Sequence, residues 1–152
     1  YVRCAGSLGW AFPASLGVKC AVGERPVVCW TGDGGFYYHI AELETAVRYG
    51  INVVVVVNNN SALNQEIPLY DAAYGGTQRG RASEMWKFTD RNFAAIAESF
   101  GCAGLRAETP AEFKDAFAAA LTMKRPVVID AVTDMRAFAP RAWQPGGTPR
   151  GH

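Results

Sequence analysis

The sequence predicts an α/β fold, doubly wound, in which a parallel sheet carries helices on both faces. Residues 53–57 are five consecutive valines, too few to cross a bilayer and too continuous for a half-exposed strand, which is typical of a central parallel strand. A shorter apolar run at 27–30 leads into the glycine-rich residues 31–35 and predicts a second buried strand. Between them, apolar residues recur at the spacing of one helix face: Phe36, Ile40, Leu43 and Val47.

The N-terminal third supplies the first elements of this fold. Residues 1–9 are predicted to form the end of a strand and a loop, and the chain starts at Tyr1 without Met, which indicates a fragment or a processed piece. Residues 10–22 predict a helix that tolerates Pro13 in its first turn. The helix predicted over 36–49 stops at Gly50, the residue type that commonly follows a helix.

The remaining chain continues the alternation of helix and strand. Residues 93–100 form an apolar helical face that ends at Gly101. Thr109, Pro110 and Glu112 are typical of a helix start, with Thr as N-cap, and that helix is predicted to reach 123. Residues 126–130 predict a further buried strand. We therefore expect one domain over 1–134, incomplete at its N-terminus, and an extended tail over 135–152.

Residues 61–90 interrupt this pattern. Helix-breaking residues are frequent in the segment, which predicts a long loop without a helix: Pro68, Gly75, Gly76 and Gly80. Long loops inside compact domains are usually functional or mobile. An equally good interpretation is a surface excursion or an oligomer contact.

Composition excludes several classes of protein. The 152 residues have a net charge of +1 and no basic cluster, so nothing indicates nucleic acid, and no apolar run is long enough to span a membrane. The four cysteines lack metal-site spacing and mostly lie in apolar segments, which predicts reduced, structural thiols and a cytoplasmic location.

Polar residues at the ends of two predicted strands indicate a phosphate and metal site. Gly34 and Gly35 allow backbone N–H groups to approach a phosphate, and a helix N-terminus after them favours negative charge. Asp33 would sit beside that phosphate if a divalent cation lay between them. Asn60 would arrive from the neighbouring strand, and this set of hard oxygen donors suits Mg²⁺.

Gly32-Asp33-Gly34, followed at this interval by Asn59-Asn60, resembles the signature of thiamine-diphosphate (ThDP) enzymes in their C-terminal, diphosphate-binding domain. The resemblance implies that Asp33, Asn60 and the backbone oxygen of Ala62 hold Mg²⁺. It also implies cofactor contacts from the remaining residues of the motif: Gly32, Gly34, Gly35 and Leu63.

The position of the asparagine ligand is open by one register. Asn58-Asn59 is also a pair, although the family's usual interval favours Asn60. A lone Gly-Asp-Gly is usually only a turn; here the spacing, the intervening helix and the valine strand support the cofactor-binding interpretation.

The segment 6–14 resembles the family stretch that holds the aminopyrimidine ring of ThDP. The resemblance implies that the Gly6 carbonyl accepts from the cofactor's amino group and that Leu8 supports its bent conformation. A leucine there is closer to benzoylformate-decarboxylase-like members, since acetolactate synthases usually carry Met. The alternative for this stretch is an ordinary helix start with a packed leucine.

Tyr38 and His39 are candidate substrate-facing residues, although a histidine there is more often structural.

The resemblance implies an acetolactate-synthase-like enzyme that decarboxylates a 2-oxo acid and ligates the product to a second carbonyl compound. The activating glutamate then lies on the pyrimidine-binding domain of a neighbouring subunit, within a homodimer or homotetramer, and no residue here matches its motif. This chain alone is therefore expected to be inactive. The alternatives are a simple 2-oxo-acid decarboxylase and a non-catalytic homologue. A Rossmann nucleotide module is disfavoured because its glycine fingerprint is missing.

Overall fold

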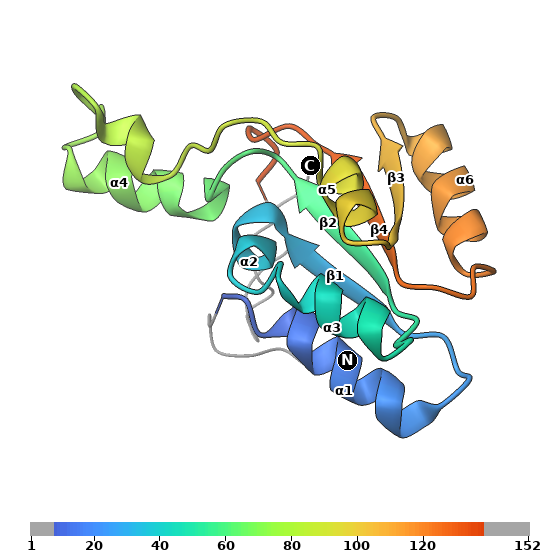
Figure 1. Ribbon diagram of the computed structural model, residues 1–152. Helices are drawn as coiled ribbons and strands as arrows, with labels where there is room; N and C mark the ends of the chain where they lie inside the picture. Colours follow the sequence, from blue (N-terminus) through green and yellow to red (C-terminus); the bar gives the residue numbers. More distant parts are fainter. Residues whose placement is uncertain (1–7, 139–152) are drawn as a thin grey trace, which may run out of the picture.

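The computed structural model describes residues 8–138, which fold around a four-stranded parallel sheet (Figure 1). The strands follow the spatial order β1-β2-β4-β3, so β2 and β4 are central. Their bounds are Val28–Gly32 for β1, Val54–Asn59 for β2, Ala103–Ala107 for β3 and Val127–Val132 for β4. The predicted fold class is confirmed, and residues 53–57 supply most of a central strand.

Helices cover both faces of the sheet. On one face lie α1 (Ala11–Val22), α2 (Asp33–Tyr37), α3 (Glu42–Arg48) and α5 (Phe93–Ser99), whereas α6 (Pro110–Ala120) lies on the other. Because successive side chains of a strand point to opposite faces, the valines of β2 divide between two cores. Val55 and Val57 pack with the first group of helices, and Val54 and Val56 pack on the α6 side.

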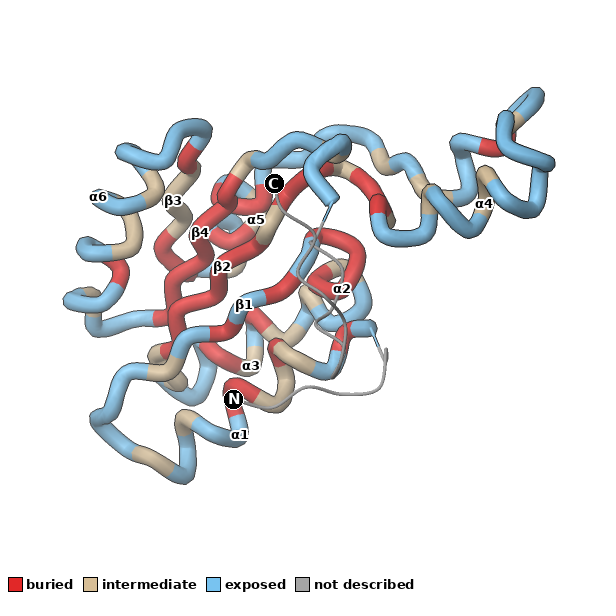
Figure 2. The backbone as a smooth tube through the Cα atoms, turned by 180° about the vertical axis from the view of Figure 1, so that it is seen from behind, coloured by how far each residue is buried: buried red, intermediate tan, exposed pale blue. Residues whose placement is uncertain are grey.

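The strand predicted as buried at 27–30 is only half-buried, and this prediction was wrong. In β1 the residues alternate between exposed and buried (Figure 2). Val28 is 42% and Trp30 62% exposed. The reason is that β1 is an edge strand of the described sheet, and on its α6-side face Trp30 meets Phe113 edge-on at 6.0 Å.

The single helix predicted over 36–49 is two helices. α2 begins at Asp33, directly after Gly32, and a turn over 38–41 separates it from α3. Phe36 anchors α2 in the core between Phe12 and Phe93, with ring centroids 5.3 and 5.7 Å away. The apolar spacing runs on through both helices, so it does not reveal the break. Gly50 ends α3 with a positive φ of 61°, as the sequence predicts.

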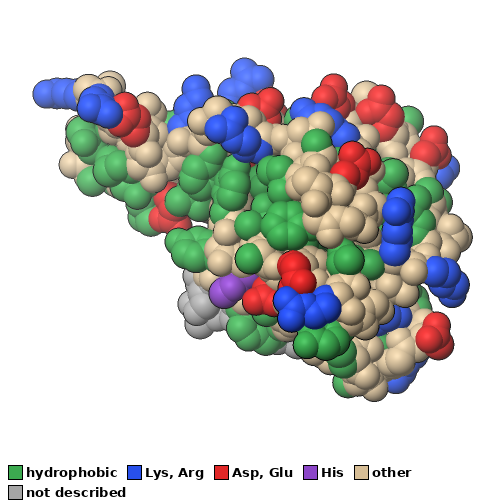
Figure 3. Space-filling view, in the orientation of Figure 1, with side chains coloured by type: hydrophobic (Ala, Val, Ile, Leu, Met, Phe, Trp, Pro, Cys, Tyr) green, Lys and Arg blue, Asp and Glu red, His purple; other side chains and the backbone are tan. Residues whose placement is uncertain are grey.

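The segment 61–90 contains a helix, contrary to the prediction. α4 spans Ile67–Ala73, between the short 3₁₀ turns Asn64–Glu66 and Ala82–Met85. Pro68 is compatible with α4 because it lies in the first turn, where no intrahelical N–H bond is lost. The segment projects away from the sheet (Figure 1), and hydrophobic side chains gather where it joins the body (Figure 3).

The C-terminal half largely follows the sequence. α5 ends before Gly101, and Thr109 is the N-cap of α6, as predicted, in a capping box with Glu112. The helix stops at Ala120 rather than at 123, and the strand Ala103–Ala107 was missed. Residues 139–152 of the predicted tail lie outside the described residues. Its first residues are tied down, since the Asn64 side chain donates to the Met135 and Ala137 carbonyls at 3.2 and 3.1 Å.

No helix within residues 8–138 has both the length and the apolar character needed to cross a bilayer.

Candidate functional site

The carboxyl ends of β1 and β2 bring the predicted metal ligands to one edge of the sheet. The two strands pair in parallel, with Gly32 opposite Asn58. Asp33 therefore starts α2 beside the point where Asn60 leaves β2. Parallel α/β sheets bind their ligands at this edge, beyond the carboxyl ends of the strands.

The side-chain oxygens of Asp33 and Asn60 converge on one backbone group. The Ala62 N–H donates to Asp33 Oδ2 at 3.2 Å and to Asn60 Oδ1 at 3.1 Å. All three residues are buried, with exposures of 2%, 8% and 4% for Asp33, Asn60 and Ala62. The three residues that the resemblance implies as metal ligands thus form one compact cluster.

The other two asparagines are engaged elsewhere. The Asn58 side chain accepts from the Thr133 hydroxyl at 2.8 Å. The Asn59 amide donates to Asp130 Oδ1 at 2.8 Å and to the Arg91 carbonyl at 2.9 Å. Of the three side chains, only that of Asn60 joins Asp33, in the register that the usual interval favours.

Two glycines of the motif lie in close contact with their surroundings. A Cβ on Gly34 would stand 2.5 Å from Leu63 Cδ2 and 3.3 Å from the Phe88 ring, and one on Gly35 would stand 3.0 Å from Thr31 Oγ1. At Gly32, by contrast, no atom of residues 8–138 lies within 4 Å of the Cβ position. The backbone at Gly32 therefore borders open space, as the approach of a phosphate requires.

Asp33 has the electrostatic character of a cation ligand. Burial raises the pKa of its carboxyl, against the lowering effect of backbone N–H donors from Gly34, Ala62 and Ser61. A divalent cation at this point would offset the desolvation and favour the charged form. Carboxylate, amide and backbone oxygens are the donors that suit Mg²⁺, so the residues present fit that ion. The described residues hold no cluster of three or more His, Cys, Asp or Glu side chains that could bind a metal ion.

The base of the projecting segment closes over this cluster. Leu63 N–H donates to the Trp86 carbonyl at 2.7 Å, and Phe88 N–H donates to the Ser61 carbonyl at 2.8 Å. These bonds bring the Phe88 ring against Gly34 and, 5.5 Å away, against the Tyr37 ring. The sequence did not single out Phe88 as a site residue, because its partners lie more than 20 positions away.

The other predicted site residues lie outside the cluster of Asp33, Asn60 and Ala62. Leu8 is 51% exposed and its Cδ2 lies 3.9 Å from the Cβ position of Gly35, so it borders the glycine motif. Tyr38 and His39 are exposed and lie against Gly9, beside the same loop. Gly6 lies outside the described residues.

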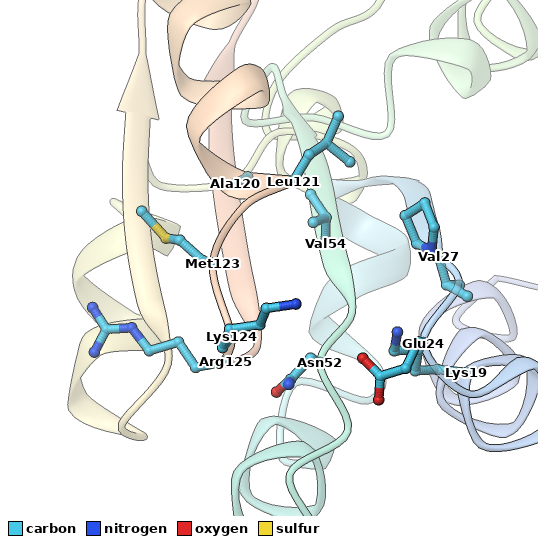
Figure 4. A pocket seen from close by; sticks show the side chains of 11 residues that line it. Lys19, Glu24, Val27, Asn52, Val54, Ala120, Leu121, Met123, Lys124 and Arg125 are labelled. Carbon is cyan, nitrogen blue, oxygen red and sulfur yellow. The ribbon is translucent and has the colours of Figure 1, made fainter.

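Two clefts lie away from the metal-ligand cluster. One of about 180 Å³ is found at the amino ends of the strands, with Lys19, Glu24, Asn52 and Lys124 at its wall (Figure 4). The other, of about 290 Å³, lies on the α6 side between Trp30, Asn58 and Phe113. Neither includes Asp33 or Asn60.

Comparison with known proteins decides the family. Residues 2–131 match the family model described as the thiamine pyrophosphate enzyme, C-terminal TPP binding domain. The chain belongs to this family of ThDP-binding domains. The resemblance and the fold class are thereby confirmed.

The relatives of this ThDP-binding domain are ThDP-dependent enzymes. It is 40% identical over 124 residues to the acetolactate synthase large subunit of Haemophilus influenzae, covering 82% of the chain and 21% of that protein. It is 36% identical over 132 residues to the isozyme 3 large subunit of Escherichia coli, covering 85% and 22%. A Rhodococcus jostii ThDP-dependent 4-hydroxybenzoylformate decarboxylase shares the fold with a TM-score of 0.73 and 29% identity, covering 84% of this chain and 23% of that one. The chain thus spans about a fifth of the length of its relatives.

Proposed function

We propose that this domain binds ThDP through Mg²⁺ within an acetolactate-synthase-like enzyme that decarboxylates a 2-oxo acid and ligates the product to a second carbonyl compound. The observation that carries the proposal is the convergence of Asp33 Oδ2 and Asn60 Oδ1 on the Ala62 N–H. Membership of the ThDP-binding family supports ThDP as the cofactor, and the relatives named acetolactate synthase support the reaction class.

In this proposal the chain's own residues bind and orient the cofactor. Asp33, Asn60 and the Ala62 carbonyl would hold the cation that neutralises the diphosphate, and the backbone around Gly32 would let the phosphates approach. Leu63 and Phe88 pack against Gly34, where they would shield one side of the cation from water. When bound, ThDP supplies the nucleophilic carbon and the electron sink for decarboxylation.

The proton transfers require groups from outside this chain. We propose that the activating glutamate comes from the pyrimidine-binding domain of a neighbouring subunit, so that the working unit is at least a homodimer. The isolated chain is then expected to turn over no 2-oxo acid. Turnover of pyruvate or benzoylformate by the isolated chain would contradict this part of the proposal.

The second candidate is a simple 2-oxo-acid decarboxylase. The likeness to the Rhodococcus decarboxylase and the leucine at position 8, in place of the methionine usual in acetolactate synthases, favour it. Product analysis of the complete protein with pyruvate and benzoylformate separates the two, because carboligation yields a hydroxy-keto product whereas simple decarboxylation yields the aldehyde.

The metal site is tested by equilibrium binding of ThDP to the complete protein, with Mg²⁺ and with a chelator. We expect binding to require Mg²⁺ and to be abolished by Asp33→Ala. Asp115→Ala removes an exposed acid from α6 and is the matched control, with wild-type binding expected. Unchanged affinity in Asp33→Ala would place the metal elsewhere, and a folded wild-type protein that binds no ThDP would favour a non-catalytic homologue.

A further inference from the structure

Asp130 is a completely buried acid at a position that the cofactor motif does not include. It lies in β4 with an exposure of 0%, on the face that carries α5. Three donors reach its two oxygens: Asn59 Nδ2 at 2.8 Å, the Phe93 N–H at 3.0 Å and Arg106 Nη1 at 2.7 Å. They come from β2, α5 and β3, so one carboxylate joins three elements that are far apart in the chain.

Among residues 8–138, the cation that pairs with the Asp130 carboxylate is Arg106. Arg106 reaches it from the neighbouring strand β3, while its Nε holds Glu108 at 2.9 Å nearer the surface. Burying a carboxylate costs desolvation free energy, and that cost is offset only when an ion pair and further hydrogen bonds stabilise the charge. An apolar side chain would fill the same site without that cost. Packing therefore does not explain an acid at position 130, whereas the hydrogen bonds that its oxygens accept could.

The carboxylate determines which way the Asn59 amide faces. Asp130 and the Arg91 carbonyl are both acceptors, so the NH₂ group of Asn59 must point toward them. The Asn59 Oδ1 is then directed at the Ser61 N–H, from which it accepts at 3.3 Å. An ionised carboxylate only accepts, so it allows no other orientation.

The bond from Ser61 sets the turn that carries the metal ligands. Ser61 has a φ of 54°, the left-handed conformation that few non-glycine residues adopt, and it separates Asn60 from Ala62. The next N–H, that of Ala62, is the group on which Asp33 and Asn60 converge. A continuous path of hydrogen bonds therefore runs from Asp130 through Asn59 to the metal-ligand turn.

We propose that Asp130 is a positioning residue for the metal site, which acts through Asn59 to hold the 59–62 turn in the geometry that binds the cation. The metal role of Asp130 rests on the proposed function, whereas the path of hydrogen bonds from Asp130 to the 59–62 turn does not. Outer residues of this kind change metal affinity by about 10- to 100-fold when they are replaced.

The test compares Asp130→Asn with Val128→Ala in the complete protein. An amide has one oxygen, so with Asn at 130 one of the three donors meets another donor and the Asn59 orientation is no longer enforced. Val128 is fully buried on the same strand and the same face, so its truncation reproduces a loss of core packing without touching Asn59. The Mg²⁺ concentration that half-saturates ThDP binding should rise about 10- to 100-fold in Asp130→Asn and stay at the wild-type value in Val128→Ala.

A double-mutant cycle separates positioning from general destabilisation. Asn59→Ala should raise the Mg²⁺ requirement to a similar degree, and the double variant Asn59→Ala/Asp130→Asn should be no worse than the more affected single variant, because both break one path. Independent, multiplying effects of the two changes would overturn the proposed path.

Amide hydrogen exchange without cofactor gives a second readout. We expect Asp130→Asn to speed exchange at residues 60–63 selectively, whereas Val128→Ala should leave the turn protected relative to the rest of the sheet. Unchanged exchange at 60–63 overturns the inference whether or not the protein binds ThDP. If the wild type binds no ThDP, the proposed function and the metal role of Asp130 fail together, and the exchange data still decide whether Asp130 holds the turn.

Discussion

Gly104 is the position where a single methyl group should have the largest effect on the fold. It lies in β3 beneath α5, and a Cβ there would stand 2.2 Å from the Ala94 carbonyl oxygen and 2.7 Å from its carbon. These are backbone atoms, so no rotamer change relieves the clash. α5 would have to move outward by about 1 Å in an interior that is packed like a crystal. Over-packing of this kind costs about 1–3 kcal/mol, and we expect Gly104→Ala to fall at the upper end.

Native-state hydrogen exchange on the complete protein measures this cost locally. A loss of about 2–3 kcal/mol corresponds to exchange roughly 30- to 150-fold faster across α5 and β3. Gly17→Ala is the matched control: no other described residue lies within 4 Å of its Cβ position, and Gly17 sits inside α1, where alanine is favoured by about 1 kcal/mol. The same chemical change should thus stabilise α1 and destabilise the α5–β3 pair. Exchange in Gly104→Ala within threefold of wild type would refute the close approach.

Three further outcomes are expected. Asn92→Ala removes the side-chain cap that accepts from the Ala95 N–H at 2.9 Å and should lower the opening free energy of α5 by about 1 kcal/mol in the same exchange experiment. Burial raises the pKa of the Cys29 and Cys102 thiols to about 11, so alkylation near pH 8 followed by peptide mass mapping should modify exposed Cys20 and spare these two; equal labelling would contradict the burial. Because the pKa of Asp33 is raised in the folded, metal-free protein, its contribution to stability is complete below the ordinary pKa and is lost as the pH rises through the raised value. The melting temperature of Asp33→Asn relative to wild type should therefore increase, without metal, as the pH rises above about 4, the ordinary pKa of an aspartate, and a flat difference would argue against the raised pKa.

The parts of the fold that the sequence predicts are those whose cause is local. The five valines of β2, the capping box of α6 and the glycine that ends α3 each act within a few residues, and each is found where expected. The glycine and asparagine motif pointed to the correct family for a different reason. Its two halves lie on adjacent parallel strands, and the resemblance supplied the spacing that joins them.

The wrong predictions concern elements whose burial or boundaries depend on residues far away in the chain. Val28 and Trp30 look like core residues, but they are exposed because β1 lies at the edge of the described sheet, and strand order cannot be seen in a single apolar run. The break after α2 is hidden because Phe36 and Leu43 keep one apolar spacing while they pack from two separate helices. α4 was missed because Pro68 was interpreted without its position in the first turn.

Asp130 shows why the supporting residues of a site are harder to find than its ligands. In the sequence it ends an apolar run and resembles the polar end of any strand. Its role depends on three donors that are 71, 37 and 24 positions away, and none of those spacings forms a motif. A cation ligand must carry a donor atom that the ion accepts, which limits its residue type. A supporting residue must only be able to form hydrogen bonds with the neighbours of a ligand, which many residue types can do. The geometry of those hydrogen bonds exists only once the four strands are in register, so the burial and hydrogen bonds of the folded chain are what identify a supporting residue.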